Sequence, residues 1–206
     1  MRTEVKVVST TGSEPITAAQ AKAYLKQEYG VIASEDVIIE RQITAARQLC
    51  EAYIDSSIVE KTIRTTFFEF QEWDYYSDGS VVLELPRGPV KSLTSVKKQV
   101  PGVSDETLTL NGNYYKLGQD WPRVKVSVAA TVTTSAAYDT DGYLVEYVAG
   151  MTSVDAPLVE GMLKTIADMY VNRGNEMENS GSRGSVAQLT YDAKMLWNPY
   201  RQTINA

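Results

Sequence analysis

The residue types that most often perform catalysis are nearly missing from this sequence. Its 206 residues include no histidine and one cysteine, Cys50. This composition excludes a Ser-His-Asp triad, a Cys-His pair, an imidazole general base, an HExxH zinc site and an intrachain disulfide. We therefore predict no catalytic residue, no metal site and no cofactor, and we expect Cys50 to be a free buried thiol.

Paired carboxylates are the remaining candidates for acid-base chemistry. Asp139 with Asp141, and Asp74 with Asp78, could in principle act as acid and base, as in glycoside hydrolysis. Both pairs lie in turn-like sequence, where aspartate hydrogen-bonds to nearby backbone. The glycine-rich stretch 181–185 lacks the spacing of a phosphate-binding loop and has no strand before it. We interpret the pairs as solvated turns and the stretch as a linker, so the sequence does not predict an enzyme.

The charge balance argues against a nucleic-acid-binding protein. The chain carries 20 Lys and Arg against 26 Asp and Glu, a net charge of -6. Proteins that grip phosphate need clustered cations, and the pair Lys97 and Lys98 is not a patch. No stretch approaches the roughly 18 apolar residues that span a bilayer, so we expect no membrane partner and synthesis in a reducing cytosol.

Three helices are predicted, over about residues 17–29, 35–54 and 156–173. Thr17 and Gln20 have the spacing of a capping box, and Gly30 can end the first helix in the left-handed conformation. Ser34 and Asp155 can cap the other two. Apolar residues recur at spacings of three and four, which predicts a core that joins the early and late helices. Its members are Ile39, Ile43, Cys50, Met162, Ile166 and Met169.

Between the helices, from about 58 to 150, the hydrophobic period changes to two. Val59, Ile63, Thr65 and Phe67 should share one face of a strand, and Thr62, Arg64, Thr66 and Phe68 the other. Further strands are predicted at about 81–85, 92–100, 107–110, 114–117, 124–132 and 143–149. The turn dipeptides between them are Asp78-Gly79, Pro101-Gly102, Asn111-Gly112 and Asp141-Gly142. We expect an antiparallel sheet in which strands pair mostly with near neighbours.

After the third helix, residues 175–185 contain almost no apolar side chain and should form a flexible connector. A last short helix is predicted over 186–197, ending before Pro199. The fold class is therefore α+β: a small helical bundle with an inserted antiparallel β region, forming one domain over 1–174, followed by a C-terminal arm over 175–206.

Tyrosine is unusually frequent, with 13 Tyr against 3 Phe. Clusters occur at 73–76, where Trp73 precedes Asp74 and two tyrosines, and at Tyr114-Tyr115. Tyrosine suits surfaces that become buried on assembly, because it offers a large contact area and keeps a polar tip. The alternative is that these rings only cover the sheet, and both interpretations stay open.

Six short motifs in order carry a resemblance to one family. They are Pro15-Ile16-Thr17, Ala45-Ala46-Arg47 with Ala52-Tyr53, Leu85-Pro86-Arg87-Gly88-Pro89-Val90, Tyr147 to Gly150, Tyr170-Val171-Asn172-Arg173 and Pro199-Tyr200-Arg201. In this order the chain resembles the head-tail connector proteins of tailed bacteriophages, also called adaptor or head-completion proteins. The resemblance covers nearly the whole chain, although residues 101–142 are longer than in compact members.

This resemblance implies a structural virion protein rather than an enzyme. It implies a homo-oligomeric, dodecameric ring on the portal vertex, located in the neck of the virion and assembled in the host cytoplasm. The implied partners are the portal protein, neck or tail proteins, and duplex DNA that passes through the channel without specific binding. A different neck or tail-completion protein, or a carbohydrate-binding β protein with a helical base, are the alternatives.

The C-terminal arm is the predicted docking segment for the portal or a neighbouring subunit. Its docking residues are Leu196, Trp197, Pro199, Tyr200 and Arg201. Trp197 is the expected anchor, because buried aromatic residues carry much of the energy of interfaces. The alternative is that the arm folds back on its own bundle. The motif residues Arg87, Pro89, Tyr170 and Arg173 are expected to act structurally, in a turn and at a helix end.

Overall fold

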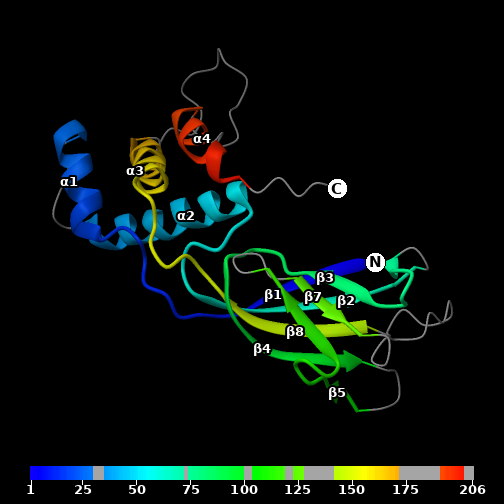
Figure 1. Ribbon diagram of the computed structural model, residues 1–206. Coiled ribbons are helices and arrows are strands. Elements are labelled where there is room, and N and C mark those ends of the chain that lie inside the picture. Colours follow the sequence, from blue (N-terminus) through cyan, green and yellow to red (C-terminus); the bar gives the residue numbers. More distant parts are fainter. Residues whose placement is uncertain are drawn as a thin grey trace. The chain divides into compact units, whose positions relative to one another are not determined.

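The computed structural model describes residues 1–29, 35–71, 74–99, 104–118, 123–127, 142–171 and 191–201 (Figure 1). They form two compact units. A β unit contains Met1–Gly12 and Val59–Met151, and a helical unit contains Ser13–Ile58 and Thr152–Ala206. This confirms the α+β class and the insertion of a β region between early and late helices. The single domain over 1–174 stays a prediction, which separate expression of the β unit would test.

A five-stranded antiparallel sheet dominates the β unit. Its order is β1 (Arg2–Thr10), β2 (Lys61–Phe68), β8 (Gly142–Ala149), β4 (Val90–Gln99) and β5 (Glu106–Thr107). The expected antiparallel pairing is therefore confirmed, but the expectation of mostly near-neighbour pairing is wrong. The last strand, β8, lies between β2 and β4. It takes the centre because its alternate side chains are buried and its other residues are half-buried, which suits a strand paired on both edges.

A smaller sheet completes the β unit. It has the order β3 (Val81–Glu84), β7 (Arg123–Val126) and β6 (Tyr114–Leu117), again antiparallel. One apolar cluster contains residues of both sheets, including Ile63, Phe67, Leu83, Val124 and Tyr147. Along β2, burial alternates residue by residue, as the sequence predicts. The core of the unit therefore lies between the two sheets.

Strand β1 is the element that the sequence analysis missed. It extends over nine residues and pairs only with β2 among the described strands, with an irregularity between Val7 and Ser9. All nine residues are exposed. Its sequence nevertheless alternates, since Arg2, Glu4 and Lys6 alternate with Thr3, Val5 and Val7, and a period of two is typical of a strand. This signal was available and was not used.

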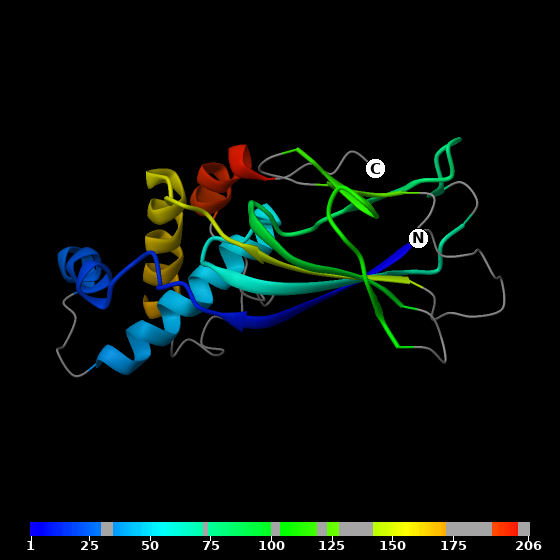
Figure 2. The same cartoon turned by 60° about the horizontal axis from the view of Figure 1, so that its bottom comes forward.

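The helical unit contains α1 (Ala18–Tyr29), α2 (Asp36–Ile54), α3 (Ala156–Val171), α4 (Tyr191–Trp197) and a 3-10 turn, η4 (Asn198–Tyr200). In both ribbon views α3, in yellow, lies beside α4, in red, and it also contacts α1 and α2 (Figures 1 and 2). No helix in the described part of the chain is long and apolar enough to cross a membrane.

The predicted helical core is confirmed. Ile39, Cys50, Met162 and Ile166 are fully buried, and Ile43 is 3% exposed. Met169 is half-buried. Cys50 is a free thiol, as expected, and burial, with a smaller effect of the Glu51 charge, raises the pKa of that thiol. Contacts between α2 and α3 therefore bring the early and late parts of the chain into one core.

The helix ends follow the sequence in part. Thr17 and Gln20 form the predicted capping box: the Thr17 N–H donates to Gln20 Oε1 at 2.9 Å, and the Gln20 N–H donates to Thr17 Oγ1 at 3.2 Å. Glu35, rather than Ser34, occupies the N-cap position of α2 and makes no capping side-chain bond. Asp55 ends α2 with a φ of 53°, in the left-handed region. Gly30 and Ser34 lie outside the described residues.

Candidate functional site

Two predicted carboxylates, Asp74 and Asp78, bond to the backbone of their own turns in the described structure. No group of three or more His, Cys, Asp or Glu among the described residues could hold a metal ion. Asp74 Oδ2 accepts the Gln71 N–H at 2.8 Å, and Asp78 Oδ1 accepts the Ser80 N–H at 3.0 Å. Both carboxylates therefore serve their own turns, as the sequence indicated. Asp139 and Asp141 lie outside the described residues.

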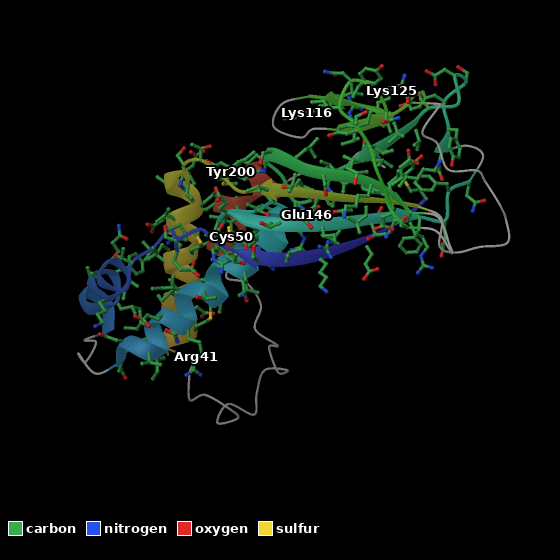
Figure 3. The ribbon with its side chains drawn as sticks, turned by 90° about the horizontal axis from the view of Figure 1, so that it is seen from below. Arg41, Cys50, Lys116, Lys125, Glu146 and Tyr200 are labelled. Carbon is green, nitrogen blue, oxygen red and sulfur yellow. The ribbon has the colours of Figure 1, made fainter. Side chains whose placement is uncertain are left out.

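The Asp78 turn is held by charge as well as by hydrogen bonds. Lys125 Nζ on β7 lies 3.0 Å from Asp78 Oδ2, on the small sheet that also carries Lys116 (Figure 3). Hydrogen bonds from Ser80, and then from Lys125, lower the pKa of Asp78. Gly79 follows with a φ of 74°, which a glycine adopts without strain. This aspartate therefore organises a hairpin and has no catalytic geometry.

The Leu85–Val90 turn presents a strained arginine. Arg87 is exposed and has a φ of 55°, in the left-handed region that costs a residue with a Cβ about 1–2 kcal/mol. The peptide bond between Gly88 and Pro89 is cis. Within the described residues the Arg87 guanidinium has no ion-pair partner.

The strand that lies at the centre of the sheet holds this turn on both sides of Arg87. Tyr147, fully buried in β8, donates its hydroxyl proton to the carbonyl oxygen of Pro86 at 2.6 Å. After β8, the Gly150 N–H donates to the carbonyl oxygen of Pro89 at 2.9 Å. The motif residues thus form one supported turn, and strained residues of this kind concentrate at functional surfaces. Arg87 is the side chain of this turn that is best placed to meet a partner.

We expect Arg87→Gly to unfold at a higher denaturant concentration than Arg87→Ala. Both variants remove the guanidinium, but only glycine relieves the left-handed backbone. The difference should be roughly 1 kcal/mol in the free energy of unfolding, measured by urea denaturation of the full chain. If the alanine variant is the more stable of the two, the left-handed conformation of Arg87 is wrong.

The C-terminal segment packs on its own helical unit. Trp197 is fully buried, and its Nε1 donates to the carbonyl oxygen of Leu158 at 3.2 Å. Its ring centroid lies 6.0 Å from that of Tyr53. A Cβ atom on Gly161 would lie 2.2 Å from Trp197 Nε1, so the indole occupies the space that a side chain would take. The fold-back alternative therefore describes this segment, and Trp197 is part of the core rather than an exposed anchor.

Other predicted docking residues remain at the surface. Pro199 and Arg201 are exposed, and Leu196 and Tyr200 are half-buried. The Arg201 guanidinium lies 5.8 Å from the centroid of the Tyr53 ring. Tyr200 belongs to the helical unit (Figure 3), and desolvation, with a hydrogen bond to Asp155, raises its pKa. Docking by these residues stays a prediction.

Tyr170, another motif residue, is structural. It is 7% exposed, and its hydroxyl hydrogen-bonds to the carboxylate of Glu35 at the start of α2. This bond ties the end of α3 to the beginning of α2. Arg173, the predicted partner of the α3 C-terminus, lies outside the described residues.

The helical unit also contains a buried ion network that no sequence signal was used to predict. Arg47 and Glu51 are 5% and 4% exposed, and Arg47 Nη1 donates to Glu51 Oε2 at 2.7 Å. Arg47 Nε donates to Glu14 Oε2 at 2.7 Å, and Glu51 Oε1 accepts the Ile58 N–H at 2.8 Å. Burial acts to lower the pKa of Arg47, but Glu14 and Glu51 together outweigh it and raise that pKa. The i, i+4 spacing of Arg47 and Glu51 was the available signal.

The tyrosines differ in exposure, so that some cover the sheet, while the interface interpretation stays a prediction for the exposed ones. Tyr143 and Tyr147 are fully buried in the β core, and Tyr114 is 8% exposed. By contrast, Tyr76 is 56% exposed and Tyr115 is 43% exposed. Neighbouring Tyr114 and Tyr115 thus face opposite sides of β6, and only the second offers contact area. Trp73 lies outside the described residues.

Comparison with known proteins relates the fold, rather than the sequence, to other structures. No family model matches the chain, and no curated protein matches it. A chain in the neck of an empty GTA particle, computed with C6 symmetry, is similar with a TM-score of 0.67 and 12% identity over 98% of both chains. A chain in the virion of a native gene transfer agent particle gives the same values.

A third similar structure is the neck of a native GTA particle computed with C12 symmetry. It has a TM-score of 0.51 and 12% identity, over 97% of this chain and 99% of that one. The similarity to all three covers the β unit and the helical unit together. At this identity it establishes a shared fold.

Proposed function

We propose that this chain is a structural, non-enzymatic subunit of the neck of a phage-like particle. The observation that carries the proposal is the similarity to a neck chain over 98% of both chains, despite 12% identity. Such coverage means that both units, in the same order, are shared with a protein that occupies a neck. The lack of histidine in the sequence is consistent with a structural role.

The finer proposal is a head-tail connector that forms a dodecameric ring on the portal vertex. The similar necks are described with C6 and C12 symmetry, and a ring of twelve subunits satisfies both. The order of motifs along the chain, from Pro15 to Arg201, resembles head-tail connectors. The portal protein and the neck or tail proteins are then its partners.

Such a ring encloses the channel through which DNA leaves the head. The net charge of -6 suits this role, because each contact between a cation and a phosphate adds affinity that would slow the passage of DNA. Some of the cations on the described surface are held in ion pairs, such as Lys91 with Glu60 and Arg64 with Glu146. We therefore propose that duplex DNA passes without specific binding.

Cryo-electron microscopy of particles that carry this chain, reconstructed without imposed symmetry, tests the proposal. We expect twelve copies around the particle axis, in contact with the portal. A single copy, or copies placed off the axis, would overturn the ring. Copies on the axis at the far end of the neck would instead assign the chain to tail completion.

A further inference from the structure

Strand β1 is an edge of the five-stranded sheet, and no other described strand pairs with its outer side. In Figure 3 it runs, in blue, along the border of the sheet beside β2. Its nine residues are exposed on both faces, and Val5, Val7 and Val8 are 37%, 40% and 46% exposed. The strand is therefore held by its pairing with β2 and contributes no buried side chain.

The inner face of β1 continues the apolar face of the sheet. Val5 pairs with Thr65 and Val7 pairs with Ile63, and both partners on β2 are fully buried. Cross-strand partners lie on the same face of a sheet. The two valines thus extend the apolar face of the sheet by one strand, and they stay exposed in the described structure.

This edge has only part of the usual protection against pairing with another strand, namely Lys6 and the irregularity between Val7 and Ser9. Natural edge strands are often also short, or carry proline, or place a charged side chain on the inner face. β1 has nine residues and no proline, and its charged residues Arg2, Glu4 and Lys6 pair with Phe68, Thr66 and Arg64 on the outer face. A long edge whose inner face carries valines rather than charges is suited to receive a strand.

A second free edge lies on the other side of the same sheet. Beyond β4, strand β5 pairs only with Lys97 and Lys98, and Leu108 donates to the carbonyl oxygen of Val96. Among the described residues no strand pairs with the outer edge of 90–95. Ser92 and Thr94 in this segment are exposed. Among the described residues, one copy of the chain thus offers two edges: the nine residues of β1 and the six residues of 90–95, which carry irregularities between Val90 and Ser92 and between Leu93 and Ser95.

The directions of these two edges are complementary. β1 is antiparallel to β2, β2 to β8 and β8 to β4, so β1 and β4 run in opposite directions. When copies stand side by side around an axis along the strands, β1 of one copy meets β4 of the next in the antiparallel sense. Such a contact uses two different surfaces, and it closes into a ring when the rotation permits.

We propose that β1 of one subunit pairs with the free 90–95 edge of β4 in the next subunit, so that the sheets join around the ring. The proposal depends on the proposed function only in assuming a ring of subunits. The strand contact itself can be tested on the purified chain. Each edge is paired with a second copy of this chain, because the two edges on one copy are complementary to each other.

Cysteine trapping identifies the partner edge. Glu4→Cys or Lys6→Cys on β1 is combined with Ser92→Cys or Ser95→Cys on β4, all on the outer face of the sheet. Directly opposed residues bring their Cβ atoms within about 4.5–5.5 Å, close enough for a disulfide after small adjustments. Cys50 is buried, with a raised thiol pKa, and does not compete.

Mild oxidation of the concentrated full chain should give a ladder of disulfide-linked dimers and higher oligomers in at least one of the four double variants. Each single variant should remain monomeric on non-reducing gels. Dimers from a β1 single variant would show β1 pairing with β1 and would overturn the proposal. Absence of a ladder in all four double variants would overturn it as well.

A charge on the inner face tests the same contact independently. Val5→Lys, added to the cross-linking variant, should lower the ladder yield roughly tenfold or more, because a buried unpaired charge costs at least about 1.4 kcal/mol. The thermal midpoint should not change, since Val5 is 37% exposed. The matched control is Val37→Lys on α2, which is 68% exposed and should leave the yield unchanged.

The two proposals fail in different ways. A ladder that survives Val5→Lys, or that Val37→Lys abolishes equally, rejects the strand contact. A twelve-copy ring in which β1 contacts no neighbouring β4 rejects the strand contact and leaves the neck function standing. A ladder from the purified chain, with no ring in particles, rejects the neck function alone.

Discussion

Trp197→Ala should destabilise the protein by about 3–5 kcal/mol, the range for removal of a large aromatic side chain from a core. Trp197 is fully buried, and its indole N–H is bonded to the carbonyl oxygen of Leu158. Since whole domains are stable by only about 5–15 kcal/mol, the helical unit should melt at a much lower temperature. Differential scanning calorimetry of the full chain measures the change.

The control is Met195→Ala, two residues earlier in α4. Met195 is 58% exposed, so its truncation should change the free energy of unfolding by no more than about 0.5 kcal/mol. Equal losses from the two substitutions would show that α4 as a whole is weakly held, and that Trp197 is not a core residue.

The effect of an alanine substitution at Gly161 on stability should change sign when Trp197 is removed. In the wild type a Cβ at position 161 would lie 2.2 Å from Trp197 Nε1, so Gly161→Ala should cost about 1–3 kcal/mol through overpacking. In the Trp197→Ala background the indole is gone. The same substitution should then stabilise α3 by up to about 1 kcal/mol, because alanine is the better helix former. A glycine substitution with the same sign in both backgrounds would contradict the contact.

The same packing changes what removal of the C-terminal segment is expected to do. An arm that only docks on a partner could be deleted without loss of stability. Because Trp197 and Ala193 are fully buried in the helical unit, deletion of 186–206 should lower the melting temperature strongly. Loss of attachment to heads in such a truncation would therefore not demonstrate docking. Pro199→Ala and Arg201→Ala, at exposed positions, are the variants that test docking.

Local signals in the sequence predicted the helices well. The reciprocal bonds of Thr17 and Gln20 depend on spacing alone, and the buried stripe of α2 depends on periodicity alone. Both features are encoded within a few residues of each other. The alternating burial of β2 belongs to the same class.

These local signals do not predict which strands pair when they lie far apart in the sequence. The sequence of 142–149 does not predict that β8 lies between β2 and β4, because a strand pattern shows which face is buried and not which strands pair. β1 alternates between charged residues and Thr or Val from Arg2 to Val7, but it buries neither face, so this pattern does not mark a strand of the core. The position of Trp197 depends on Gly161, a glycine within α3 that lies 36 residues away in the sequence. The space that Gly161 leaves beside α3 can be recognised only once the indole of Trp197 is placed there.

Glu51→Gln should destabilise the helical unit by about 3 kcal/mol. Glu51 accepts from Arg47 through one carboxylate oxygen and from the Ile58 N–H through the other, and both charged side chains are buried. A glutamine can satisfy the Ile58 N–H, but its amide group then faces the guanidinium with a donor. Breaking a buried ion pair from one side costs about 3–5 kcal/mol. We expect the lower end, because Glu14 still neutralises Arg47.

The second substitution, Arg47→Met, should recover much of this loss. In the double variant no uncompensated guanidinium remains, and a glutamine at 51 still accepts from Ile58. Replacement of a buried ion pair by residues of similar volume is often neutral. The exposed pair Arg64 and Glu146 supplies the control: Glu146→Gln should cost less than about 1 kcal/mol, since Arg64 is 43% exposed. If Glu51→Gln and Glu146→Gln cost the same, or if Arg47→Met adds to the loss, the network does not carry the stability assigned to it.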